Sequence, residues 1–245
     1  MSKRPAPRRP VCGGGGAGTP HGARSDTAVF DVDGTLIDTN YHHALAWYRA
    51  FRSYDITLPV WRLHRAIGMG GDQLVAAVAG EEVEARLGDD LRDRWVREFE
   101  PMLDEVQPFE GARELLEEVR RRGFPLVLAS SGKKAHVEHY LDLIDGASIA
   151  QAWTTADDVE RTKPAPDLLL VAVAKVHGTS GVVVGDSVWD FEAANRAGYP
   201  GYAIRTGGFS PDELRDAGAR RVYDSLTELH QHLDETALAH PDRSA

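Results

Sequence analysis

Two aspartates one residue apart, Asp31 and Asp33, follow a short apolar run at residues 27–30 and precede a glycine and a threonine. The run has the length and residue types of a buried strand, so it places both carboxylates at the strand's C-terminal end, where open α/β sheets bind ligands. One acid there can act as a nucleophile or metal ligand, and the other as a general acid and base. A polar turn after a strand would look the same, so the interpretation depends on partners at other strand ends.

A hydroxyl group follows a second apolar run. Residues 124–129 lead into Ser130, the first residue of the sequence SSGK. A hydroxyl at a strand end, beside a helix N-terminus with free amide groups, suits a phosphoryl oxygen. The alternative is that Ser130 caps the next helix.

A lysine, Lys163, lies in the sequence RTKPAPD at residues 161–167. An isolated lysine is usually solvated surface. Here, Pro164 and Pro166 hold the backbone extended and can direct the ammonium group to a fixed point.

A further pair of acids follows the β-branched run at residues 181–184. The spacing GDxxxD puts Asp186 at the strand end and Asp190 one turn into the next helix. Carboxylates so placed form an oxygen-only site that suits Mg²⁺. For Asp190, the alternative is a solvated acid favoured by the helix dipole.

These four motifs occur in the order DxDGT, Ser, Lys-Pro and GDxxxD, each at the end of a predicted strand. Over residues 27–233 this order resembles the haloacid dehalogenase-like (HAD) hydrolases, most closely the subgroup of phosphoglycolate phosphatases and β-phosphoglucomutases. The dehalogenase branch lacks the second acid, which is present here as Asp33. The phosphonate-cleaving branch needs a cap lysine, and residues 38–104 contain none. The resemblance therefore implies a phosphatase.

The resemblance also implies a role for each core residue. Asp31 would be the nucleophile that becomes an aspartyl-phosphate, and Asp33 would protonate the leaving oxygen and then deprotonate the attacking water. Lys163 would add positive charge, and Ser130 with nearby amides would hold the phosphoryl oxygens. The remaining predicted substrate-binding residues are Thr35, His43, Ser131, Gly132 and Lys133.

The cofactor implied by the resemblance is Mg²⁺. It would bind the Asp31 carboxylate, the Asp33 backbone carbonyl and Asp186, and so offset the repulsion between nucleophile and phosphate. Asp190, the remaining candidate at the metal site, would orient Lys163 or a metal-bound water.

The alternation of strand-like and helical segments indicates an α/β fold with a parallel, doubly wound, Rossmann-like sheet. Residues 38–107 are helical in pattern throughout, which predicts a helical cap domain inserted after the first strand, with Asn40 capping its first helix. The core domain would then comprise residues 25–37 and 108–236. Strands are expected at residues 27–30, 126–129, 152–154, 182–184 and 202–204.

Composition limits the partners and the location. Residues 1–24 are rich in Pro and Gly and hold five basic residues and no acid, so a disordered tail is expected there, and another at 237–245. The net charge of −10 argues against nucleic acid as the main partner. No stretch is long and apolar enough to span a membrane. A single cysteine, Cys12, fits a cytoplasmic protein. We expect a monomer or homodimer that acts on a small phosphorylated metabolite.

The predicted cap would choose the alcohol to which the phosphate is attached. His43 there would position a substrate hydroxyl or the Asp33 side chain, unless it is a surface histidine. The cap loop at residues 68–72 lacks the arginine that phosphomutases use for a distal phosphate, which favours simple hydrolysis; Arg62 and Arg65 are the candidates to replace it. Two alternatives remain. One is a sugar phosphomutase, favoured by Lys133 and His43. The other is a catalytically silent phosphate-binding protein, against which the complete set of catalytic residues argues.

Overall fold

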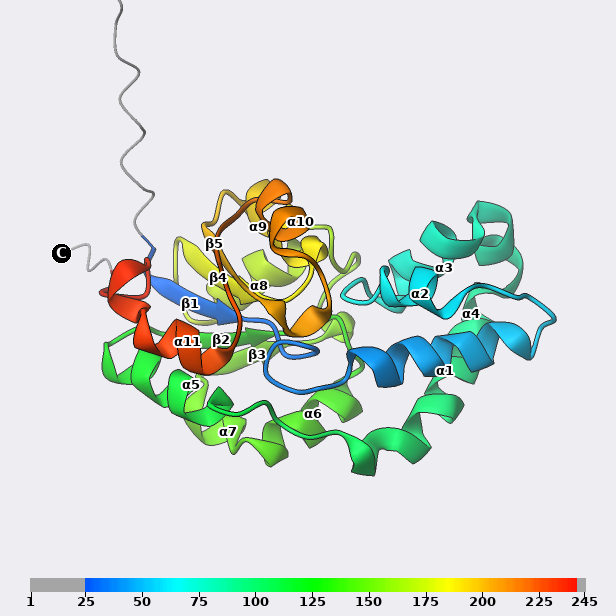
Figure 1. Cartoon of the computed structure of the whole chain (residues 1–245), viewed down its shortest axis with the longest axis horizontal. Coiled ribbons are helices and arrows are strands. Elements are labelled where there is room, and N and C mark those ends of the chain that lie inside the picture. Colours follow the sequence, from blue (N-terminus) through cyan, green and yellow to red (C-terminus); the bar gives the residue numbers. More distant parts are fainter. Residues whose placement is uncertain (1–24, 242–245) are drawn as a thin grey trace, which may run out of the picture.

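The computed structural model describes residues 25–241 of the 245-residue chain. The predicted N-terminal tail, residues 1–24, and residues 242–245 lie outside the described part. The chain forms a sheet covered by helices, with a second, wholly helical lobe beyond one end of the sheet (Figure 1). This is the predicted core with an inserted cap.

A six-stranded sheet in which all pairings are parallel forms the centre of the core, in the order β3-β2-β1-β4-β5-β6. Phe30, the last residue of the first strand, is aligned with Leu128 and with Val184 in the two neighbouring strands. The strand order reverses beside the first strand, and open α/β sheets bind their ligands in the crevice at such a point. The strands are β1 (Thr27–Phe30), β2 (Leu126–Ala129), β3 (Ala152–Thr154), β4 (Gly181–Gly185), β5 (Gly201–Ile204) and β6 (Ala219–Tyr223).

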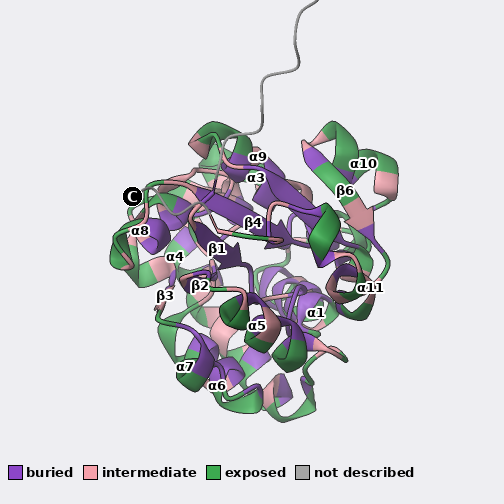
Figure 2. Ribbon diagram, turned by 90° about the vertical axis from the view of Figure 1, so that its left-hand side faces the viewer, coloured by how far each residue is buried: buried purple, intermediate pink, exposed green. Residues whose placement is uncertain are grey.

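Helices cover both faces of the sheet, as the doubly wound prediction requires. Successive strand residues point to opposite faces, so Val29 packs in one hydrophobic cluster and Phe30 in another. Figure 2 shows the strands buried between helices whose outer faces are exposed. On one face lie α5 (Ala112–Arg121), α6 (Lys134–Leu143), α7 (Gly146–Ile149) and α11 (Leu226–Gln231), and on the other lie α8 (Asp167–Lys175), α9 (Val188–Ala197) and α10 (Pro211–Asp216). Short 3₁₀ segments span Ala156–Asp158, Arg205–Gly207 and Leu233–Glu235.

The cap consists of α1 (Asn40–Arg52), α2 (Val60–His64), α3 (Gly71–Ala79), α4 (Glu81–Phe99) and a 3₁₀ segment, Glu100–Glu105. Its two connections to the core run side by side, because Ile37 pairs with Pro108 in an antiparallel bridge. The Asp38 amide donates to the Gln107 carbonyl at 2.9 Å. The chain therefore enters and leaves the cap at neighbouring points, beside residues 37–38 and 107–108. None of the described helices is both long and apolar enough to cross a membrane.

Two local predictions are wrong. Asn40 does not cap the first cap helix: the N-cap position is Thr39, and its side chain makes no capping hydrogen bond. The described residues 237–241 are not a disordered tail either. Leu238 is fully buried in the main hydrophobic cluster, and the Ala237 amide donates to the Tyr202 hydroxyl oxygen at 2.8 Å. The core therefore extends past residue 236.

Leu238→Ala is expected to lower the free energy of unfolding by about 2–5 kcal/mol, because it removes a buried side chain and leaves a cavity. Urea denaturation followed by circular dichroism measures this loss. Leu170→Ala is the matched control, since Leu170 is 45% exposed. Equal midpoints for the two variants would contradict the packed C-terminal segment.

Candidate active site

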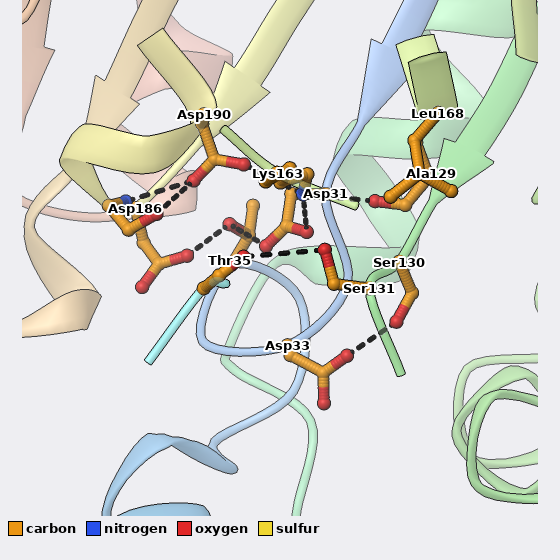
Figure 3. Close-up of polar contacts among 12 residues, drawn as sticks. Asp31, Asp33, Thr35, Ala129, Ser130, Ser131, Lys163, Leu168, Asp186 and Asp190 are labelled. Atoms are coloured by element: carbon orange, nitrogen blue, oxygen red, sulfur yellow. Dashed lines mark hydrogen bonds and ion pairs between the residues drawn. The ribbon is translucent and has the colours of Figure 1, made fainter. Parts of the chain in front are cut away.

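Lys163 and Asp31 form the centre of the site, at the C-terminal end of β1 (Figure 3). The Lys163 ammonium donates to Asp31 Oδ1, to the Ala129 carbonyl at 3.2 Å, and is 2.7 Å from Asp190 Oδ1. Burial lowers the pKa of Lys163, but the charges of Asp190 and Asp31 together raise it above its ordinary value. A protonated lysine, 1% exposed, is thus held between two carboxylates.

Asp186 lies beside this pair, at the end of β4. The Thr35 hydroxyl is 3.0 Å from Asp31 Oδ2 and 2.9 Å from Asp186 Oδ1, and so bridges the two carboxylates. The Asn40 amide donates to Asp186 Oδ2 at 2.7 Å. Gly34 in the intervening turn has a φ of +79°, and a Cβ there would be 2.5 Å from Asp186 Oδ2. Only glycine permits this close approach of the turn.

The three buried carboxylates Asp31, Asp186 and Asp190 each offer an oxygen within 4.8 Å of the others. Lys163 forms ion pairs with Asp31 and Asp190, so one positive charge faces three acidic side chains. Burial raises the pKa of Asp31 well above its ordinary value, against the effect of Lys163. Burial also raises the pKa of Asp186 to about 7, with a further contribution from the charge of Asp190. An oxygen-only cluster with excess negative charge fits a hard divalent cation, so these residues can hold a metal ion.

Asp190 contributes to this cluster mainly through Lys163. Its Oδ2 accepts the Ser187 amide at 3.0 Å and the Ser187 hydroxyl at 2.7 Å, in the first turn of α9. Its Oδ1 faces the Lys163 ammonium. Asp190 is therefore a buried acid in contact with Lys163 and not a solvated helix-end acid.

The second acid, Asp33, lies in a separate set of hydrogen bonds. Its Oδ1 accepts from the Thr39 hydroxyl at 3.2 Å and lies 2.9 Å from His43 Nε2, and its Oδ2 accepts from the Ser130 hydroxyl at 2.6 Å. Burial raises the pKa of Asp33, but hydrogen bonds from His43, Ser130 and Thr39 outweigh it and lower the pKa overall. Because Thr39 and His43 lie at the start of the cap and Ser130 in the core, Asp33 joins the two lobes.

Ser130 does not cap the next helix. Helix α6 begins at Lys134, with Lys133 as its N-cap residue, and the Gly132 amide donates to the Ser130 hydroxyl at 2.8 Å. The Ser131 hydroxyl donates to the Gly68 carbonyl of the cap loop at 3.3 Å. The SSGK sequence thus holds Asp33 on one side and contacts the cap on the other.

A cavity of about 230 Å³ opens over the two aspartates, between core and cap. The cap loop closes one side of it: the Gly70 amide donates to the Thr162 hydroxyl at 3.0 Å, and the Thr162 amide donates to Asp72 Oδ2 at 3.1 Å. Thr162 directly precedes Lys163, so the cap contacts the segment that carries this lysine. Predicted site residues that line the cavity are Asp31, Asp33, His43, Ser131, Gly132 and Lys133.

Sequence reasoning missed several residues of the site: Asn40 as an Asp186 partner, Thr162, Asp72, and Arg92 and Trp95 in the cavity wall. For Asn40 there was a signal. Asn40, His43 and Trp47 recur at i, i+3 and i+7, so they share one helix face, and all three are buried. The position of Asn40 on this inward face indicates a buried polar partner, which a role as helix cap does not require.

Comparisons with known proteins agree with this geometry. The family model of the haloacid dehalogenase-like hydrolases matches residues 25–198. A phosphoglycolate phosphatase of Caulobacter vibrioides is 29% identical over 86% of this chain and 92% of its own length. A validoxylamine A 7′-phosphate phosphatase of Streptomyces hygroscopicus subsp. limoneus is 28% identical over 70% of this chain and 81% of its own.

Among solved structures, a hydrolase from Pseudomonas syringae superimposes with a TM-score of 0.80 and 33% identity, covering 85% of this chain and 98% of the other. The match thus includes both the sheet and the inserted helical lobe. On its motifs, its fold and these relatives, the chain belongs to the haloacid dehalogenase-like hydrolases.

Proposed function

We propose that this protein is a Mg²⁺-dependent phosphatase that hydrolyses a small phosphomonoester through an aspartyl-phosphate on Asp31. The observation that carries the proposal is the pairing of a buried, lysine-bound Asp31 with a second acid, Asp33, on the floor of one cavity. The names of both relatives, each a phosphatase of a phosphorylated small molecule, support it.

Asp31 is the group proposed to attack phosphorus. Lys163 and Thr35 engage its two oxygens and fix their orientation. Phosphoryl transfer depends mostly on such in-line positioning and on neutralising charge. A Mg²⁺ ion held by Asp31, Asp186 and the Asp33 carbonyl would supply the positive charge that the cluster lacks.

Asp33 is proposed as the proton donor to the leaving oxygen and then as the base for water. Its carboxylate is 13% exposed on the cavity side, and three donors hold it in place. Substrate phosphate, an anion brought next to Asp33, would favour the protonated form that the first step needs. Ser131, Gly132 and Lys133 line the same cavity and are proposed to bind the phosphoryl oxygens.

Asp186→Ala is expected to raise the Mg²⁺ concentration for half-maximal activity by at least about 100-fold. Loss of a residue that only hydrogen-bonds to a metal ligand lowers metal affinity by about 10–100-fold. Asp186 is proposed as a direct ligand, so its loss should cost more. Titration of activity with Mg²⁺ measures the change, with Asp216→Ala, an exposed acid distant from the cavity, as the control. Full activity of the wild type in excess chelator would contradict the metal site.

The phosphomutase alternative requires a cap cation for a distal phosphate. Arg65, one of the candidates from the sequence, pairs with Glu213 at 2.5 Å and lies over the Phe209 ring. Arg92 does line the cavity, but its guanidinium bonds Glu84 and Asp89, each at 2.9 Å. Since these arginines are already paired, hydrolysis is the better supported reaction.

Incubation with β-glucose 1-phosphate and a trace of glucose 1,6-bisphosphate tests this choice. We expect release of inorganic phosphate without any need for the bisphosphate. Rapid formation of glucose 6-phosphate without phosphate release would establish the mutase instead. A panel of phosphomonoesters, assayed with and without Mg²⁺, tests the phosphatase proposal itself: release from none of them would overturn it.

A further inference from the structure

The cavity above Asp31 and Asp33 is small. Its volume of about 230 Å³ is below the ~300–1,000 Å³ of sites that hold drug-sized ligands. It therefore has room for a phosphoryl group and one ring, and not for an extended chain.

Part of the cap side of the cavity is apolar. Trp47 from α1 and Trp95 from α4 line it, with ring centroids 5.5 Å apart and planes inclined by 18°. Met69 from the cap loop adds a flexible apolar surface. The two indole rings stack on each other and are only 3% and 8% exposed, so together with Met69 they form a rigid apolar wall of limited area. Such a wall favours a ligand with an apolar face, such as the C–H face of a sugar ring or an aromatic ring.

The cations of the cavity offer no second anion site. Arg92 donates to Glu84 and Asp89 and to the Gly71 carbonyl at 3.0 Å, so its charge is compensated within the cap. Lys133 is exposed, and no carboxylate among residues 25–241 lies within ion-pair distance of it. Because Lys133 directly follows the SSG loop, which is proposed to bind the phosphoryl oxygens, its ammonium group would pair with the phosphoryl group and not with a second anion of the substrate.

The rim of the cavity is acidic. Asp157 and Glu160 line it, both are exposed, and neither has an ion-pair partner in the described part of the chain. A carboxylate or second phosphate on the substrate would approach these charges without a compensating cation. Like charges brought together in this way cost affinity and select against the wrong ligand.

We propose that the substrate is the monophosphate of an uncharged or cationic alcohol that carries a ring with an apolar face, and that the cavity discriminates against alcohols with a further anionic group. This inference rests on the proposed phosphatase function and narrows its substrate class. It predicts that 2-phosphoglycolate is a poor substrate, although a relative bears the name phosphoglycolate phosphatase.

The first test compares kcat/KM for matched esters. 2-Phosphoglycolate carries a carboxylate where 2-hydroxyethyl phosphate carries an uncharged hydroxymethyl group. We expect kcat/KM for 2-hydroxyethyl phosphate to be higher by at least about tenfold. Benzyl phosphate and glucose 6-phosphate, both esters of alkyl alcohols, should each be hydrolysed with a higher kcat/KM than 2-hydroxyethyl phosphate, and the ratio of their values tells a preference for an aromatic face from a preference for a sugar face. Equal or faster hydrolysis of 2-phosphoglycolate would overturn the inference.

The second test reverses a rim charge. Glu160→Lys should raise the ratio of kcat/KM for 2-phosphoglycolate to kcat/KM for benzyl phosphate by at least about fivefold, because the reversed charge acts on the additional carboxylate. Glu160→Gln should give a smaller change in the same direction. Asp216→Lys alters the net charge by the same amount at an exposed position away from the cavity, and it should leave this ratio of kcat/KM values unchanged. A similar response in Asp216→Lys and Glu160→Lys would show that the rim is not selective.

A binding measurement separates this inference from the phosphatase proposal. Calorimetric titration of the Asp31→Asn protein with the same four esters reports the preference of the cavity without turnover. If the wild type hydrolyses none of the esters, the proposed function fails. Tighter binding of the ring-bearing esters would still support the cavity's selectivity, and tighter binding of 2-phosphoglycolate would overturn it.

Discussion

Asp31→Asn is expected to lower kcat by more than about 10⁴-fold, on the scale that loss of a nucleophile causes in other covalent enzymes. The amide cannot attack phosphorus, and it is a neutral, weaker metal ligand. Asp31 is also bonded by Lys163 and Thr35, so the variant keeps these neighbours in place. The rate of phosphate release under saturating substrate and Mg²⁺ measures the effect.

Asp157→Asn is the matched control for this variant, because it removes a carboxylate from the rim of the same cavity. It should retain wild-type kcat within about threefold, as for a group outside the reaction. Trapping the phosphorylated enzyme with acid and locating the label by peptide mapping identifies the nucleophile directly. Near-wild-type turnover of Asp31→Asn, or a label on another residue, would refute the covalent mechanism.

Asp33→Asn is expected to slow both chemical steps, because in the proposed mechanism its side chain serves first as acid and then as base. With an alkyl phosphate, whose leaving group needs a proton, kcat should fall by about 10²–10⁴-fold. With p-nitrophenyl phosphate, whose leaving group needs none, the first step should remain fast and the second slow. Rapid-mixing experiments should then show a burst of one p-nitrophenol per active site.

The His43 side chain provides a comparison for the same step. His43→Gln removes a ring that contacts Asp33 at 2.9 Å but leaves the Ser130 and Thr39 hydrogen bonds. Its loss of activity should therefore be smaller than that of Asp33→Asn. An Asp33→Asn variant with unchanged kcat for an alkyl phosphate would show that another group transfers the proton.

Much of the core was predictable because its signals are local. Strands β1, β2 and β3 match the expected residues, and β4 and β5 extend the expected ranges by one or two residues. The four inner strands, β2, β1, β4 and β5, are apolar runs that are buried throughout. Strand β6 was not predicted. It is an edge strand in which Arg220 and Arg221 are exposed, so it lacks the continuous apolar run of the inner strands.

The sequence by itself also determined that Asp31 and Asp186 meet. Both follow parallel strands, and the C-terminal ends of such strands lie at the same edge of a sheet. By contrast, only the tertiary structure decided that Asn40 bonds Asp186, 146 positions away, and that Asp72 of the cap bonds Thr162, the residue before Lys163. Periodicity and motif spacing record which side chains face inward along one element. They do not record how the cap packs on the core, and that packing sets which distant side chains become partners and which charges a substrate would meet.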